Sequence, residues 1–424
     1  MATPSGLQIA QPLTLKCGLT LPNRLVKAAM AEQLAGPNQL PDERLQAVYK
    51  HWAAGGWGMI ITGHVHVDAA HLGHPLDAAI PTSTLPLSSL TPPYSAYATA
   101  SQGPSTSART PAIIQLNHPG RQSPRGAGSR GLFTPAMAPS AIPLSLGAGL
   151  IPSLLRSLVF GTPREMTSDD IATVISQFAR AAKVVADAGF AGVEIHAAHG
   201  YLLSQFLSKK SNQRGDGYGG DAKGRARIVG EIVGAVREAT KGVEGFCVGV
   251  KVNSADYQGE GEVREWVEQV RVVVEAGVDF VEVSGGSYED PKMMYGHNGP
   301  AETDEKSDRT KAREAFFLEF AQILRKEFPD VPLMVTGGFS SRLGLERAVA
   351  DGDCDLVGLG RPAVLNPALP NNVIFNSSIK DQDATLYRKK NKTPWIIKQL
   401  GMAAVGAGMD SQWHTDQIQK FVNL

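Results

Sequence analysis

Two histidines and a tyrosine stand within six positions of one another at the end of an apolar run. The segment reads Gly192-Val193-Glu194-Ile195-His196-Ala197-Ala198-His199-Gly200-Tyr201, and its apolar first half is typical of a buried strand. In α/β enzymes the side chains at strand ends build the chemistry. Two imidazole rings can bind a substrate oxygen through their N–H groups while a phenol delivers a proton nearby. The candidate catalytic residues are therefore His196, His199 and Tyr201.

Other roles for this histidine pair are open at this point. The two rings could be structural, with one of them bonded to a backbone carbonyl. A zinc site would need a third ligand, and none stands at a recognisable spacing from the pair. A second group, His64-x-His66 followed by His71 and His74, could also hold a metal. We expect instead that His64 faces the site, that the others are surface or loop residues, and that no metal is bound.

The overall composition indicates a neutral intracellular protein with a large core. Its 424 residues are 42% hydrophobic, and 41 Lys and Arg residues balance 41 Asp and Glu residues. The absence of net charge gives no reason to expect nucleic acid or an anionic membrane as a partner. The 3 cysteines are too scattered for a disulfide framework, which favours a reducing compartment. With neither a secretion signal nor an apolar run of membrane-spanning length, we expect a cytoplasmic protein.

A helix end, a glycine and a short apolar strand recur along the chain. The glycines are Gly55, Gly189, Gly277 and Gly352, and glycine is favoured after a helix because it adopts the left-handed conformation. This alternation predicts a parallel sheet with crossover helices. The strands that fit are Leu25–Met30, Met59–Thr62, Ala112–Leu116, Val193–His196, Cys247–Val252, Phe280–Val283, Leu333–Thr336 and Leu356–Leu359. Their number is that of a closed (β/α)8 TIM barrel, and a doubly wound open sheet is the alternative.

Three segments depart from this alternation. Residues 80–110 are rich in Pro, Ser and Thr, which favours a flexible loop around at most one short helix. Residues 118–165 and 285–312 are long excursions after the third and sixth strands, at the end of the barrel where active-site lids lie. We therefore divide the chain into a barrel over residues 1–370 and a tail over residues 371–424 that packs outside it.

Several longer motifs give the sequence a resemblance to a known family. They are Asn23-Arg24-Leu25-Val26, Gln115-Leu116-Asn117-His118, His196-Ala197-Ala198-His199-Gly200-Tyr201, Ser211-Asn212-Gln213-Arg214, Tyr218-Gly219-Gly220 and Gly358-Leu359-Gly360-Arg361-Pro362. With them the chain resembles the Old Yellow Enzyme family of FMN-dependent ene-reductases, from about Leu13 to about Asn366. The resemblance implies a TIM barrel that binds FMN, takes hydride from NAD(P)H and passes it to an activated alkene.

The resemblance also assigns roles to single residues. In the family the histidine pair binds the carbonyl or nitro oxygen of the alkene and the tyrosine protonates the α-carbon, so these roles would fall to His196, His199 and Tyr201. Gln115 would bond the pyrimidine edge of the flavin, because its amide has both a donor and an acceptor. Lys251, where many relatives have arginine, would place a positive charge beside flavin N1 and O2. An inward-pointing lysine without a partner would be costly, which also favours this role.

Phosphate binding would fall to two glycine-containing turns. Gly337 and Gly338 follow the seventh strand, and Gly360 with Arg361 follows the eighth. Barrel enzymes often hold phosphate with backbone N–H groups from these two loops. A separate Rossmann domain is not expected, because no Gly-x-Gly-x-x-Gly motif opens a βαβ unit.

The end of the first strand carries a departure from the family. Ala29, Met30 and Ala31 would lie against the flavin, together with His64 from the second strand. Relatives usually have Thr or Cys where Ala31 stands, and that side chain bonds the flavin and tunes its potential. The sequence therefore puts the flavin potential in question, although not flavin binding.

We therefore expect a cytoplasmic FMN enzyme that reduces the activated C=C bond of α,β-unsaturated carbonyl or nitro compounds with hydride from NADH or NADPH. Its partners would be small molecules, with neither nucleic acid nor membrane, and a homodimer is a further expectation. Two alternatives stay open. One is a redox-neutral isomerase or desaturase on the same barrel. The other is a flavin-free binding protein, against which the presence of Gln115, Lys251 and Arg361 argues.

Overall fold

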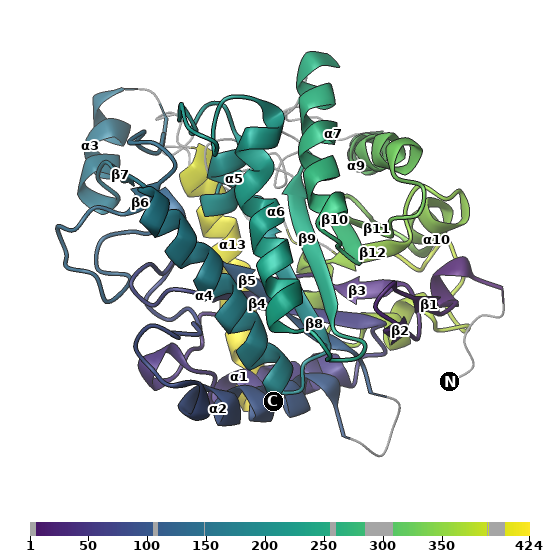
Figure 1. Cartoon of the computed structure of the whole chain (residues 1–424). Coiled ribbons are helices and arrows are strands. Elements are labelled where there is room, and N and C mark those ends of the chain that lie inside the picture. The colour runs from purple at the N-terminus through teal and green to yellow at the C-terminus, as the bar shows by residue number, and fades with distance from the viewer. Residues whose placement is uncertain are drawn as a thin grey trace.

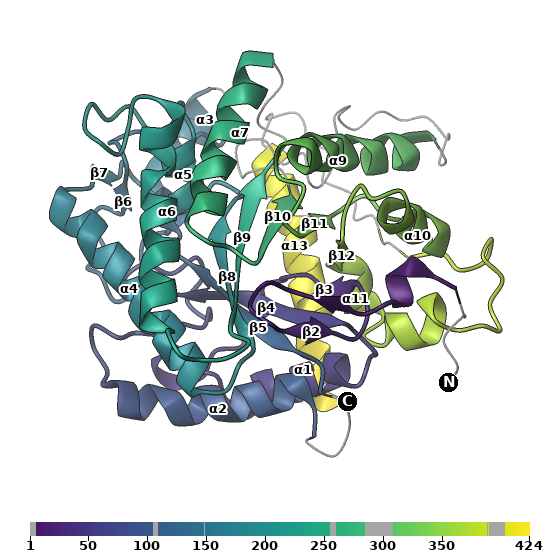
Figure 2. The same cartoon turned by 45° about the vertical axis from the view of Figure 1, so that its right-hand side comes forward.

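The computed structural model describes residues 6–104, 109–147, 149–254, 260–284, 308–387, 389 and 403–424. Within them, parallel strands close into a barrel in the order β3, β4, β5, β8, β9, β10, β11 and β12 (Figures 1 and 2). Their bounds are Leu25–Lys27 (β3), Met59–His66 (β4), Ala112–Asn117 (β5), Gly192–Ala197 (β8), Cys247–Asn253 (β9), Phe280–Ser284 (β10), Leu333–Thr336 (β11) and Leu356–Leu359 (β12). The predicted TIM barrel is confirmed, and the open sheet is excluded.

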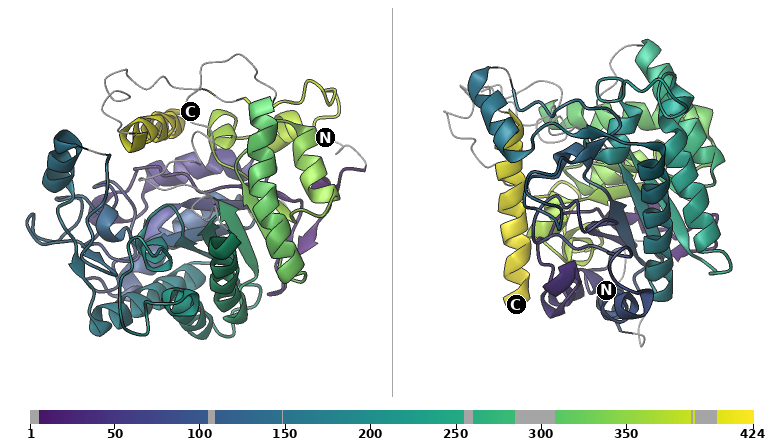
Figure 3. Two further views of the ribbon diagram at one scale, coloured as in Figure 1. Left: turned by 90° about the horizontal axis from the view of Figure 1, so that it is seen from above. Right: turned by 60° about the vertical axis from the view of Figure 1, so that its left-hand side comes forward.

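Each barrel strand is followed along the chain by a helix on the outside of the barrel, as the view from above shows (Figure 3). These helices are α1 (Glu43–Ala53), α2 (Leu87–Gln102), α4 (Ser168–Asp187), α6 (Ala222–Ala239), α7 (Glu260–Glu275), α9 (Asp308–Glu327), α10 (Arg342–Ala350) and α11 (Arg361–Leu365). The start of α4 is fixed by a capping box, in which the Thr167 side chain accepts from the Asp170 N–H and the Asp170 carboxylate accepts from the Thr167 N–H.

Further strands and helices lie outside this alternation of barrel strands and helices. Strands β1 (Leu13–Thr14) and β2 (Thr20–Leu21) form an antiparallel pair, and β6 (Met137–Ala138) pairs in parallel with β7 (Arg164–Glu165). The remaining helices are α3 (Leu150–Val159), α5 (Leu202–Leu207) and α13 (Ala403–Gln419). Single turns of tighter or wider helix are Gln8–Ala10, Pro37–Gln39, Gly120–Gln122, Pro370–Ile374 and Lys420–Asn423.

The interior of the barrel below the strand ends is filled with apolar side chains. They include Val26, Met59, Ile61, Ile113, Cys247, Phe280, Met334 and Leu356, all fully buried. Gly249 makes room for one of them, because a Cβ there would lie 2.2 Å from the ring of Phe280. This packed floor leaves the C-terminal ends of the strands as the place for a site.

The helix–glycine–strand repeat is present with one shift of position. Gly189, Gly277 and Gly352 have positive φ angles of 85°, 95° and 79° after their helices. In the first repeat, however, the left-handed residue is Gly56, with φ 84°, rather than Gly55. Gly55 instead allows a close approach of the chain, because a Cβ there would lie 2.3 Å from the carbonyl oxygen of Pro367.

The prediction for residues 80–110 was wrong, because this segment contains the 16-residue helix α2. Pro92 and Pro93 lie inside the helix and remove backbone donors. Tertiary packing outweighs this loss. Tyr97 packs edge-on against the rings of Tyr49 and Phe190, at centroid distances of 5.0 and 5.4 Å, and Tyr94 donates from its hydroxyl to the Ala79 carbonyl. Composition alone does not report such contacts.

The two predicted excursions differ in what can be described. Residues 118–165 contain β6, α3 and β7 beside the mouth of the barrel. Of the excursion at 285–312, residues 285–307 lie outside the described residues.

Within the predicted tail, α13 runs along the side of the barrel (Figure 3). In the described part of the chain, no helix is long and apolar enough to cross a membrane.

Candidate active site

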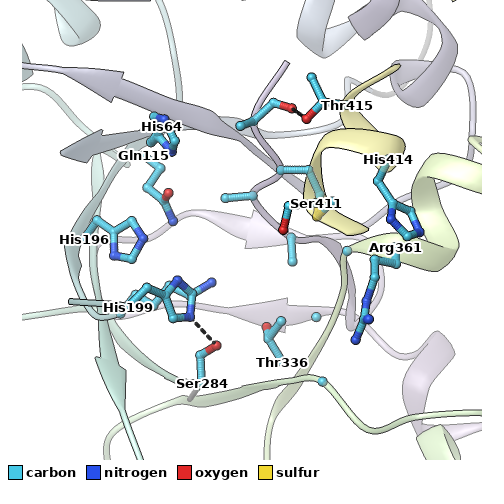
Figure 4. A pocket seen from close by; sticks show the side chains of 18 of the residues that line it. His64, Gln115, His196, His199, Ser284, Thr336, Arg361, Ser411, His414 and Thr415 are labelled. Carbon is cyan, nitrogen blue, oxygen red and sulfur yellow. Dashed lines mark hydrogen bonds between the residues drawn. The ribbon is translucent and has the colours of Figure 1, made fainter. Parts of the chain in front are cut away.

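A cavity of about 420 Å³ opens at the C-terminal ends of the barrel strands. Every candidate residue from the sequence lines it: Ala29, Met30, Ala31, His64, Gln115, His196, His199, Tyr201, Lys251, Gly337, Gly338, Gly360 and Arg361. In Figure 4 the two histidines lie on the opposite side of this cavity from Arg361. The barrel therefore brings together residues that lie more than 300 positions apart in the chain.

His196 is the last inward-facing residue of β8 and is 2% exposed. Its Nδ1 accepts a hydrogen bond of 3.2 Å from the Ala198 N–H. A neutral imidazole has one N–H group, so the proton stands on Nε2. His196 can therefore offer an Nε2–H donor to a ligand in the cavity.

His199 is held in place by its backbone and by its ring. It has a left-handed backbone, with φ 57°, and its N–H donates to Asn253 Oδ1 over 2.9 Å. Its Nε2 lies 3.1 Å from Ser284 Oγ at the end of β10 (Figure 4). The ring centroids of His196 and His199 are 5.0 Å apart and the rings are nearly perpendicular. A non-glycine residue in this conformation costs free energy, which is typical of a functional position.

Both rings are neutral at ordinary pH. Burial, followed by the neighbouring His199 and the positive charge of Lys251, lowers the pKa of His196 well below its usual value. Burial and Lys251 do the same to the pKa of His199. A pair of neutral imidazoles can donate hydrogen bonds to an oxygen without carrying a net charge into the cavity.

Tyr201 completes the predicted catalytic set. It precedes α5, and its ring packs edge-on against that of His196, with centroids 4.9 Å apart. The ring of His64 lies 5.7 Å from it, centroid to centroid. The phenol ring therefore contacts both the histidine pair and β4.

A buried polar row lies below the histidines and follows from strand register. Gln115 pairs with Glu194, and Lys251 pairs with both His196 and Glu282. Gln115 Nε2 donates to Glu194 Oε2 over 2.5 Å, and Lys251 Nζ lies 2.6 Å from Glu282 Oε1. An inward lysine without a partner would be costly, but Lys251 has a partner in Glu282 on the adjacent strand.

The two carboxyl groups of this row differ in protonation. Burial and the neighbouring Glu282 raise the pKa of Glu194 well above its usual value, so Glu194 is protonated. Burial opposes ionisation of Glu282 as well, but Lys251 lowers the pKa of Glu282 overall. The pair of Lys251 and Glu282 is thus close to neutral, and the row can stay buried without an uncompensated charge.

The expectation for the second histidine group was partly wrong. His64 faces the cavity and His71 lies in a loop, both as expected, although His71 is buried; His66 differs, because it is a fully buried residue of β4. Asp77 explains the burial, because its Oδ2 lies 3.2 Å from His64 Nε2 and 3.0 Å from His66 Nε2. His71 Nδ1 similarly lies 2.6 Å from Asp68 Oδ2. The sequence could not indicate these carboxylate partners, which come from the loop after β4.

The opposite side of the cavity is built from backbone and glycine. Gly337 and Gly338 have positive φ angles of 115° and 86° after β11. At Gly358, a Cβ would lie 1.9 Å from Thr336 Oγ1. Arg361 Nη1, after β12, lies 3.5 Å from Asp410 Oδ2 of α13. This side therefore combines glycine-containing turns, whose backbone a ligand can approach closely, with the cation of Arg361. A phosphate site requires both.

Comparison with known proteins shows which family the chain belongs to. The model of the NADH:flavin oxidoreductase / NADH oxidase family matches residues 8–377. The chain belongs to this family. Its members include the Old Yellow Enzymes, so the resemblance found in the sequence is confirmed. The protein is accordingly an NAD(P)H-dependent flavin oxidoreductase with FMN as its cofactor.

Fungal members of the family are similar over most of this chain. NADH-dependent flavin oxidoreductase iccE of Talaromyces variabilis is 46% identical over 417 residues, covering 98% of each chain. NADH-dependent flavin oxidoreductase iliE of Hypocrea jecorina (strain QM6a) is 45% identical over 405 residues, covering 96% of this chain and 98% of that protein. The protein of the same name from Neonectria sp. (strain DH2) is 50% identical over 416 residues, but this chain spans only 53% of its length.

Solved structures agree on the fold. Morphinone reductase superposes with a TM-score of 0.67 at 24% identity, covering 87% of this chain and 89% of that one. A 2-naphthoyl-CoA reductase complex superposes with a TM-score of 0.71 at 22% identity, covering 89% of this chain and 53% of that one. At these identities the likeness concerns the barrel alone.

The residues around the cavity fit the FMN of this flavin oxidoreductase. Lys251 and Gln115 present polar groups at one end, and Arg361 presents a cation at the other. The bare Cα of Gly358 lets the Thr336 side chain of β11 pack directly against β12 in the cavity wall. A volume of about 420 Å³ is within the range of small-molecule sites.

Sequence reasoning missed several residues that line or support the site of this oxidoreductase. Asp77 and Ser284 bond the candidate histidines, and Glu194 supports Gln115. Glu194 had a readable signal, because it lies two residues before His196 in a strand and must face the same side. The α13 residues gave no signal at all: Gly408, Ser411, Gln412, His414 and Thr415 line the cavity from the predicted tail.

Proposed function

We propose that this flavin oxidoreductase reduces the activated C=C bond of α,β-unsaturated carbonyl or nitro compounds. The observation that supports the proposal is the neutral histidine pair, in which His196 offers Nε2–H toward the cavity beside His199 and Tyr201. Two neutral donors suit an oxygen that becomes negatively charged during the reaction.

The residues divide the reaction among them. His196 and His199 bind the substrate oxygen and polarise the conjugated system, which makes the β-carbon electrophilic. FMN, when bound, supplies the hydride that it has taken from NADH or NADPH. Tyr201 gives a proton to the α-carbon from its phenol hydroxyl.

The remaining candidate residues would hold the cofactor. Gln115 and Lys251 would bind its pyrimidine edge, and the pairing of Lys251 with Glu282 would reduce the net positive charge there. Backbone N–H groups of the turns after β11 and β12 would bind the phosphate together with Arg361. The first-strand and β4 residues would lie against the ring system: Ala29, Met30, Ala31 and His64.

An anaerobic experiment tests the proposal. The visible spectrum of the purified protein is recorded, the flavin is reduced with NADH or NADPH, and a panel of cyclic enones and nitroalkenes is added. We expect full reoxidation of the flavin by at least one alkene, with one saturated product formed per flavin. Reduced flavin that reacts with oxygen but with no member of the panel would contradict the proposal.

One observation favours a second candidate, redox-neutral isomerisation. The cavity contains an acid–base group, His64, that hydride transfer does not use. His64 Nε2 contacts Asp77 Oδ2, and the His64 ring packs against that of Tyr201. Although burial acts in the opposite direction, Asp77 raises the pKa of His64 overall. Tyr201 and His64 could together move a proton between two carbons. Turnover of a substrate without net consumption of NAD(P)H would identify this reaction.

A further inference from the structure

The helix α13 forms one wall of the cavity. It is attached to the end of the first barrel strand by side-chain bonds: Thr415 Oγ1 donates to the Ala31 carbonyl over 2.9 Å, and Gln419 Nε2 donates to the Glu32 carbonyl over 3.1 Å. In Figure 4, Ser411, His414 and Thr415 lie across the cavity from the histidine pair. The helix is thus fixed beside the site rather than merely adjacent to the barrel.

His414 is a buried polar side chain of this wall. It is 0% exposed and it lines the cavity beside Arg361. Its Nδ1 lies 2.8 Å from the Asp410 carbonyl, which can only accept, so Nδ1 carries the proton. Nε2 is therefore a bare acceptor, and it is buried without a hydrogen-bond partner in the described protein.

A buried acceptor without a partner is costly, and native proteins rarely keep one. A bound ligand is one way to satisfy it. Burial lowers the pKa of His414, and the charge of Arg361 acts in the same direction, so the ring stays neutral and cannot donate from Nε2. The partner must then be a donor. A phosphate dianion has no proton to give, whereas a hydroxyl group does.

We propose that α13 is part of the cofactor site and that His414 Nε2 accepts a hydrogen bond from a hydroxyl of the ribityl chain of FMN. The position of His414 beside Arg361 supports this, because the ribityl chain joins the ring system to the phosphate that Arg361 would bind. The inference rests on FMN as the cofactor of the family and is independent of the substrate proposed above. A hydroxyl of the nicotinamide ribose or of the substrate has the same chemistry, and the experiment separates these sources.

The test measures FMN affinity rather than turnover. Apoprotein is titrated with FMN and the quenching of flavin fluorescence gives the Kd. The variant His414→Leu removes the acceptor, and we expect the Kd to rise about fivefold to tenfold, the effect of one lost hydrogen bond. His414→Gln keeps an acceptor oxygen and should recover part of this loss. Asp416→Asn, an exposed change on the same helix, is the matched control and should leave the Kd unchanged.

A cofactor analogue assigns the hydroxyl. The same titrations are made with an FMN analogue in which an unsubstituted pentyl chain joins the ring system to the phosphate. We expect His414→Leu to bind this analogue as well as the wild type does, since no hydroxyl remains to bond. Thermal melting of each apoprotein checks the fold, and His414→Phe, which keeps a ring but no acceptor, replaces His414→Leu if that variant does not fold.

Two outcomes would overturn the inference. One is an unchanged Kd for FMN in His414→Leu or His414→Phe, and a raised KM for NADH or for an alkene would then assign the acceptor to that ligand. The other is an equal loss of affinity for FMN and for the hydroxyl-free analogue, which would show that His414 only supports the shape of the wall.

Discussion

The two ends of the cavity are built in different ways. At the histidine end (Gln115, His196, His199, Tyr201 and Lys251), side chains from β5, β8 and β9 are already bonded to protein partners such as Glu194, Ser284 and Glu282. At the glycine end (Gly337, Gly338, Gly358, Gly360 and Arg361, with α13), backbone dominates, and His414 Nε2 has no partner among the described residues. The first end is organised before a ligand arrives, whereas the second is completed by one.

This difference separates two kinds of contribution. Hydrogen-bond donors that are already fixed in a buried, low-dielectric site stabilise the charge that develops in the transition state. They do so without having to reorient during the reaction. Open backbone and unpartnered acceptors contribute to ligand affinity instead. We therefore expect changes at the histidine end to affect rate and changes at the glycine end to affect cofactor binding.

The largest effect is expected from His196→Ala at the histidine end. Loss of one donor to the substrate oxygen should slow flavin reoxidation by an enone about 10²- to 10³-fold. Flavin content should remain that of the wild type, and binding of a phenol in the cavity should weaken. Stopped-flow measurement of the reoxidation rate checks this, and an unchanged rate would remove His196 from the mechanism.

Gly358→Ala tests the glycine end. The new Cβ would lie 1.9 Å from Thr336 Oγ1 and 2.6 Å from Met334 Cε, so these side chains of β11 must move. We expect a loss of about 1–3 kcal/mol in the free energy of unfolding, together with weaker FMN binding. The rate of alkene reduction per bound flavin should stay near the wild-type value. The exposed Gly234 of α6, where a Cβ meets nothing within 4 Å, provides the control Gly234→Ala.

The buried histidines predict a loss of stability in acid. Burial lowers the pKa of His196 and His199 well below the value of about 6.5 in the unfolded chain, and burial lowers the pKa of His118 to about 4. As the pH falls below about 6.5, the unfolded state binds protons that the folded state does not, so stability falls by up to about 1.4 kcal/mol per pH unit for each group. Urea unfolding at about pH 7.5 and about pH 5.5 measures this dependence.

A variant attributes part of that dependence to the histidine end. Replacing both His196 and His199 by Asn removes two of the titrating groups and should make the pH dependence of stability shallower. The same slope in the wild type and in the double variant would show that other groups control acid unfolding.

The smallest effect is expected from Ala31→Thr, which restores a hydroxyl that relatives carry. Because one neutral hydrogen bond is involved, the flavin midpoint potential should change by no more than about 30 mV. Redox titration against a reference dye measures the change. A much larger shift would show that Ala31 is a main determinant of the potential in this enzyme.

The barrel and the histidine end could be predicted because their signals are local. Short apolar runs indicated the barrel strands, four of them preceded by a glycine after a helix, and His196, His199 and Tyr201 lie within one continuous segment. The prediction failed at α2, where Tyr94 and Tyr97 pack against the barrel and outweigh two prolines. It also expected His66 in a loop or at the surface and did not foresee that His71 is buried, because the carboxylates of Asp77 and Asp68 reach these rings only in the folded chain.

The sequence by itself determined the fold class, the family resemblance and the set of candidate catalytic side chains, because periodicity and motif order are properties of neighbouring residues. Only the tertiary structure decided what those side chains meet. Strand register gave Lys251 its partner Glu282 and Gln115 its partner Glu194. Closure of the barrel brought Arg361 and α13 to the cavity that His196 faces. Such partners are set by contacts between distant segments, which no local pattern encodes.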